Sequence, residues 1–177
     1  GQALPADDQN IPWLFTTAMN TPEKLGDNDH LQIIFYLVPE SYKGKIYLWI
    51  EDPGCSYEND YINGIPDSKF KLQIYGGIDL TINYGDNNPA RGILLVDTIF
   101  ENEGPGLFIS EGIEPWKGQY IPALKSNLFK VLIRGLEGDD GNNYRLYFSK
   151  SNFIREQPEN GKIFYNELSF KLPEKTQ

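Results

Sequence analysis

Apolar and polar residues alternate along much of this chain, and the period of the alternation is two. In residues 69–75, KFKLQIY, Phe70, Leu72 and Ile74 fall on one side, and lysine and glutamine fall between them. Successive side chains of a β-strand point to opposite faces, so this pattern is typical of a strand with one face on a core and one in water. The sequence therefore predicts strands rather than helices.

The same pattern recurs in short segments separated by glycine and proline. Residues 78–84, IDLTINY, repeat the alternation, and Gly76–Gly77 before them predicts a tight hairpin. No window of ten or more residues carries a helical apolar stripe, and at most 21–26 or 121–127 makes one helical turn. Further strands are expected at 31–38, 45–51, 92–99, 106–110, 127–134, 143–149 and 167–172, with 162–166 pairing with the last.

These elements predict an all-β protein, an antiparallel β-sandwich of jelly-roll type with little or no helix. Segments 31–38 and 92–99 are apolar on both faces, so we expect both in the middle of a sheet. Residues 1–30 are expected to form an N-terminal extension, in which Trp13–Phe15 cover a sheet edge or add an edge strand. Residues 31–177 are expected to form one sandwich domain.

Charge and length narrow the classes of partner. The 177 residues include 16 basic and 25 acidic side chains, a net charge of −9, so we expect no nucleic-acid binding. No apolar run approaches the roughly 20 residues that a membrane helix needs, and we expect no membrane insertion. The chain starts with Gly1 rather than Met, which suggests a processed product or a chain trimmed for expression, and a secreted or periplasmic location is expected.

Few residues are available for covalent chemistry. The single Cys55 allows no internal disulfide and no cysteine-based zinc site, and a catalytic triad would depend on His30 alone. The nucleophile-elbow, P-loop, HExxH and GxGxxG motifs are absent. A carboxylate-dependent glycan-active enzyme needs two acids facing each other across a bond, and no pattern marks such a pair. We therefore expect a binding protein rather than an enzyme.

Two acidic loops raise the question of a calcium ion. Residues 138–143, GDDGNN, have the composition that a tight turn requires, although Asp139 and Asp140 also offer oxygen ligands. The strands on either side are expected to place Phe129, Val131, Ile133, Tyr144, Leu146 and Phe148 inward. Ca²⁺ takes six to eight oxygens, so a second loop would have to contribute.

The second loop is residues 51–61, which hold Glu51, Asp52, Glu58 and Asp60. Carboxylates this close repel one another without a counterion, so this loop is the better calcium candidate. Solvated turns and a structural calcium site both remain open for the two loops.

Aromatic residues are the second candidate chemistry, with 3 Trp, 11 Tyr and 10 Phe. Exposed aromatic faces on β-sandwiches bind sugar rings. Trp116 and Tyr120 lie in a loop-like segment and form either such a platform or a plug on the open end of the sandwich. Trp49 and Tyr47 share one side of a predicted strand and are either core or a flat aromatic strip. Arg91 is a candidate polar partner.

Two segments share a pattern with a known family. Residues 128–149 run from an alternating strand through an acidic turn into an Asn-aromatic-x-Leu strand, and residues 36–54 run from Val-Pro through Gly into an alternating strand. Both resemble the bacterial pre-peptidase C-terminal type of β-sandwich, over roughly a quarter of the chain. The resemblance implies an accessory, non-catalytic module of an exported bacterial protein, sometimes calcium-bound, that assists substrate or surface attachment.

The sequence thus predicts a module that binds a carbohydrate or cell-surface glycan. The alternatives are a structural or protein-interaction domain that uses a sheet face or edge strand, and a carboxylate-dependent glycan-active enzyme.

Overall fold

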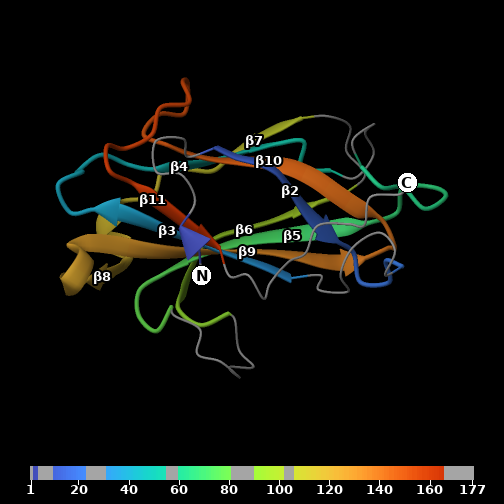
Figure 1. The fold of residues 1–177 in the computed structure, drawn as a ribbon, viewed down its shortest axis with the longest axis horizontal. Coiled ribbons are helices and arrows are strands. Elements are labelled where there is room, and N and C mark those ends of the chain that lie inside the picture. Colours follow the sequence, from blue (N-terminus) through green and yellow to red (C-terminus); the bar gives the residue numbers. More distant parts are fainter. Residues whose placement is uncertain are drawn as a thin grey trace.

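The computed structural model describes residues 2–3, 10–22, 31–54, 60–80, 90–101 and 106–165. Two antiparallel β-sheets stack face to face, which confirms the predicted all-β sandwich (Figure 1). Two single turns of 3₁₀ helix, η2 (Pro115–Lys117) and η3 (Pro122–Leu124), are the helical segments of the described residues, and η3 falls in the range where one turn was predicted. Within the same ranges, no helix has the length and apolar character to cross a membrane.

Strand order defines the two layers, and every pairing is antiparallel. The larger, seven-stranded sheet runs β1 (Gln2–Ala3), β11 (Lys162–Tyr165), β3 (Leu31–Pro39), β9 (Ser126–Glu137), β5 (Lys69–Gly76) and β6 (Ile93–Phe100), with β8 (Gln119–Ile121) pairing with β9. The smaller, four-stranded sheet runs β2 (Asn10–Thr17), β10 (Gly141–Ser149), β4 (Tyr47–Glu51) and β7 (Leu107–Ile109).

The core lies between the sheets and contains the residues that the alternation places inward. Those of β9 (Phe129, Val131, Ile133) and of β10 (Tyr144, Leu146, Phe148) are all buried, as predicted. Tyr36 of β3 stacks on Phe148 with ring centroids 3.9 Å apart, which joins the two layers. β9 and β10 are consecutive in the chain but belong to different sheets, so the turn between them carries the chain across the sandwich.

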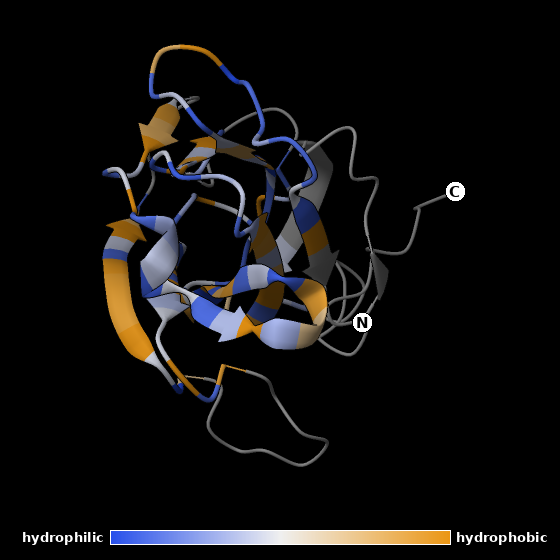
Figure 2. Ribbon diagram, turned by 90° about the vertical axis from the view of Figure 1, so that its left-hand side faces the viewer, coloured by the Kyte–Doolittle hydropathy of each residue, from blue (hydrophilic) through white to orange (hydrophobic). Residues whose placement is uncertain are grey.

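The prediction that both doubly apolar strands are central is right for β3 and wrong for β6. β3 lies between β11 and β9, whereas β6 ends the larger sheet and pairs with β5. Ile93, Leu94 and Ile99 of β6 are exposed, and Figure 2 shows this strand at the left-hand edge of the molecule. Apolar residues on both faces allow a strand to be buried in the middle of a sheet. Whether it lies there depends on the strand order, which the pattern does not specify.

The hairpin predicted at Gly76–Gly77 is also wrong in its described part. Residues 78–80 form no strand, and β5 pairs with β6 and β9 instead. Gly77 has φ +86° and donates its N–H to the Lys117 carbonyl at 2.8 Å, so the chain bends away. Leu80 is then buried against the outer face of the larger sheet. Residues 81–84 lie outside the described residues.

The two ends of the chain contribute edge segments. β2 pairs with β10 at the edge of the smaller sheet, which matches the edge-strand alternative for the segment around Trp13–Phe15. β11 pairs with β3 and β1. Its predicted partner, 167–172, lies outside the described residues, as does the one-turn helix considered over most of 21–26.

Candidate functional site

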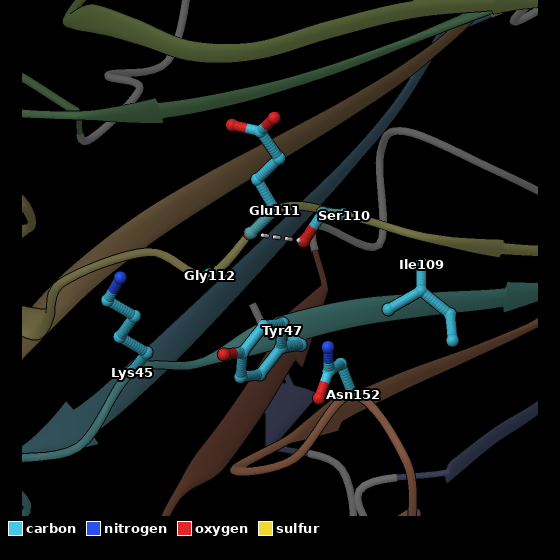
Figure 3. Close-up of a pocket in the computed structure, with 7 residues that line it drawn as sticks. All are labelled: Lys45, Tyr47, Ile109, Ser110, Glu111, Gly112 and Asn152. Carbon is cyan, nitrogen blue, oxygen red and sulfur yellow. Dashed lines mark hydrogen bonds between the residues drawn. The ribbon is translucent and has the colours of Figure 1, made fainter.

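A shallow cleft of about 520 Å³ opens on the outer face of the smaller sheet, where β4 begins. Figure 3 shows its lining, which comes from three separate segments of the chain. Among the residues that the sequence singled out for ligand binding, Tyr47 is part of this lining. The seven lining residues are Lys45, Tyr47, Ile109, Ser110, Glu111, Gly112 and Asn152.

The first wall of the cleft, residues 109–112, is fixed to β4 by hydrogen bonds. Ser110 N–H donates to the Leu48 carbonyl at 2.8 Å, and Leu48 N–H donates back to Ser110 Oγ at 2.9 Å. A Cβ at Gly112 would lie 2.9 Å from the Tyr47 hydroxyl and 2.7 Å from Lys45 Cδ. Glycine at this position therefore lets the tyrosine ring and the lysine stem pack directly against the wall.

The second wall is a loop of residues 150–157, here called the strap, which contributes Asn152. Ser149 Oγ accepts N–H groups of Ser151 and Glu156 at 3.1 and 3.0 Å, which closes the base of the loop. Trp49 Nε1 donates to the Ser151 carbonyl at 3.1 Å, and the Arg155 guanidinium lies 2.6 Å from Glu51. These bonds hold the strap against the outer face of the smaller sheet.

Several polar groups in the cleft are not used by the fold. Among the described residues, the Tyr47 hydroxyl, the Glu111 carboxylate and the Asn152 amide have no hydrogen-bond partner. Lys45 makes one long ion pair, 3.9 Å to Glu114, which is worth little at an exposed position. An aromatic ring with free donors and acceptors around it is the composition of a site for a polar ligand.

Trp49 and Tyr47 share the outer face of β4 but differ in access. The Trp49 side chain is 7% exposed because the strap covers it. The predicted continuous aromatic strip is therefore wrong: Trp49 positions the strap, and Tyr47 alone reaches the cleft.

Trp116, Tyr120 and Arg91 lie around the larger sheet, and the structure does not bring them to the Tyr47 cleft. Trp116 in η2 is 73% exposed, so the plug interpretation is wrong and the platform interpretation stays a prediction. Tyr120 in β8 is half exposed and donates its hydroxyl to Glu40 at 2.6 Å. The carbonyl of Arg91, just before β6, accepts a hydrogen bond from the buried Lys130 ammonium at 2.9 Å.

Asp140 fastens a distant loop to the β9–β10 turn. Its carboxylate is fully buried and accepts the N–H groups of Asn63 and Asp67 at 2.8 and 3.1 Å and the Ser68 hydroxyl at 2.9 Å. Gly138 has φ +88°, and a Cβ there would lie 2.3 Å from Ser68 Oγ. The turn composition is thus explained by close packing against residues 60–68.

The same packing brings predicted metal ligands together. Asp67, Asp139 and Asp140 each offer a carboxylate oxygen within 4.8 Å of the others. Asp60 accepts the Asn143 N–H at 2.8 Å, so the two acidic loops do meet, while Glu58 lies outside the described residues. Three carboxylates are part of a calcium ligand set of six to eight oxygens. The calcium ion stays a prediction, and Asp67 is a candidate ligand that sequence reasoning missed.

Asp52 follows β4 and is separate from that group. It has φ +59°, is buried, and one of its carboxylate oxygens has no hydrogen-bond partner among the described residues. Burial raises the pKa of the Asp52 carboxyl above its ordinary value of 3.8 because the charged form is poorly solvated.

No family model, curated protein or solved structure matches the chain. The resemblance to the pre-peptidase C-terminal sandwich therefore stays a prediction. A fold does not by itself specify a function, which resides in the geometry and chemistry of a site.

We expect Asp140→Ala to lower the free energy of unfolding by about 2–4 kcal/mol, because it leaves two backbone N–H groups and a hydroxyl without their acceptor. Asp139→Ala is the matched control, since within the described part of the chain Asp139 accepts one exposed hydrogen bond, from the Asn63 amide. It should cost less than about 1 kcal/mol in urea unfolding. Equal losses for the two variants would contradict the fastening role of Asp140.

We expect Asp52→Asn to stabilise the protein at pH 7, because the folded state then holds no desolvated charge. A raised carboxyl pKa costs stability at pH values above the folded pKa, and the cost disappears as the pH falls to the ordinary value of 3.8. Thermal unfolding from pH 7 to pH 4 should therefore show the two proteins converging. If Asp52 instead held calcium, the variant would be less stable than the parent in the presence of Ca²⁺.

Proposed function

We propose that the protein is a non-catalytic carbohydrate-binding module that takes its ligand in the cleft beside Tyr47. The observation that carries the proposal is the convergence of one accessible aromatic ring and three unengaged polar groups on a single opening. A sugar ring presents C–H bonds on its face and hydroxyls on its rim. The first suit an aromatic surface and the second suit polar side chains around it.

The hydrogen-bonding capacity of the cleft matches hydroxyl groups. Asn152 both donates and accepts, Glu111 accepts, and Lys45 donates, while a hydroxyl can do either. Both walls are fixed by bonds within the protein, so the ligand need not order them. The cleft holds both a cation, Lys45, and an anion, Glu111. A neutral polyhydroxylated ligand therefore fits better than a strongly charged one, which one of the two would repel.

Binding is better supported than hydrolysis. Glycoside hydrolysis requires two carboxyl groups that face each other across the scissile bond. Glu111 is the one carboxylate among the residues that line the cleft. The accessory role and the secreted or periplasmic location remain predictions of the sequence.

We expect Tyr47→Ala to weaken binding of the best ligand in a panel of soluble oligosaccharides by tenfold or more, a loss of about 1.4 kcal/mol. Titration followed by tryptophan fluorescence measures the affinity. Trp116→Ala is the matched control, since it removes an exposed aromatic residue outside the cleft and should change neither affinity nor unfolding temperature. Loss of binding in Trp116→Ala alone would move the site to η2.

The edge strand β6 favours a second candidate, a protein-interaction domain. Of the described strands, β5 alone pairs with β6, and Ile93, Leu94 and Ile99 are exposed along it. An extended segment of another chain could add to this edge through main-chain hydrogen bonds. A Leu94→Lys variant that loses a partner bound by the parent protein, while retaining sugar binding, would support this candidate.

A further inference from the structure

The tip of the strap holds two large apolar side chains in solvent, directly after the cleft residue Asn152. Phe153 is 85% exposed and Ile154 is 67% exposed. Figure 2 shows this tip as the orange segment at the top of the molecule. Single exposed apolar residues are ordinary on protein surfaces, and here two such residues are neighbours on a projecting loop.

The chain holds this tip in place rather than letting it collapse onto the sheet. Ser151 Oγ accepts the N–H groups of Phe153 and Ile154 at 3.1 and 3.3 Å. Lys150 pairs with Glu156 at 2.8 Å across the base of the loop. Together with the bonds that Trp49 and Arg155 make, these contacts fix a conformation that buries neither apolar side chain.

We propose that the natural ligand of the cleft is amphiphilic: a sugar that carries a hydrocarbon group, which packs on Phe153 and Ile154. The inference rests on the proposed carbohydrate site and names its ligand class. Asn152 lines the cleft and Phe153 follows it in the chain, so the apolar tip begins one residue beyond the cleft lining. The cleft lining is mostly polar, and the apolar tip follows it in the chain. The sugar of the proposed ligand therefore occupies the cleft, and its hydrocarbon group contacts the tip.

The charges favour a single amphiphile over an anionic bilayer. The net charge of −9 repels anionic headgroups. The two cations of the strap are both paired, Lys150 with Glu156 and Arg155 with Glu51. The apolar tip therefore lacks the free basic residues that assist binding to an anionic membrane.

The test compares methyl and octyl β-D-glucopyranoside, and the corresponding galactosides and mannosides, below the micelle-forming concentration of the octyl compounds. We expect at least one octyl glycoside to bind about tenfold or more tightly than its methyl partner, because it buries additional apolar area. The double variant Phe153→Ser with Ile154→Ser should lose this preference and leave methyl glycoside affinity unchanged. Ile65→Ser, at a position that is 83% exposed in another loop, should keep the preference.

Each outcome separates this inference from the proposed function. Equal affinity for methyl and octyl partners, or a preference that the double variant retains, overturns the amphiphilic ligand and leaves the sugar site intact. Failure of every glycoside to bind overturns both. Binding to sugar-free phosphatidylcholine vesicles that the double variant abolishes would identify a bilayer as the occupant and also overturn the inference.

Discussion

The contact on which the rest of the structure depends is the one between Asp140 and residues 60–68. The turn at Asp140 is the point where the chain leaves β9 in one sheet and enters β10 in the other. A buried carboxylate is costly unless donors compensate it, and here two backbone N–H groups and a hydroxyl do so. Fixing this crossing sets how the two layers face each other, and so where β4 and its outer surface lie.

Side-chain direction was predictable from the sequence, whereas strand neighbours were not. The period of two placed the inward residues of β9 and β10 correctly because a strand presents alternate residues to one face whatever lies beside it. Strand order depends on connections and on contacts between distant segments. The run Ile93–Val96 is therefore consistent with a central strand, and the structure places it at an edge. Gly76–Gly77 likewise permits a hairpin without specifying its partner.

The candidate site was only partly predictable, because its members are distant in the chain and ordinary in type. Tyr47 could be singled out as an aromatic residue on a strand face. Lys45, Glu111 and Asn152 carry no local signal, and the sheet pairing of β4 with β7 and β10 is what brings their segments together. The sequence also left the solvent exposure of each aromatic residue undetermined. The strap covers Trp49, whereas no comparable segment of the described residues covers Trp116.

The strap shows how one loop can serve stability and recognition at once. Its base uses the indole of Trp49, the carboxylate of Glu51 and the hydroxyl of Ser149, so the loop's anchoring depends on the sheet beneath it. Its tip is then left with an amide and two apolar side chains that make no contribution to this anchoring. Loops held on a rigid scaffold are where binding residues concentrate, since they can change without loss of the core. The division between an anchored base and a projecting tip is therefore consistent with the proposal that this end of the sandwich contacts a ligand.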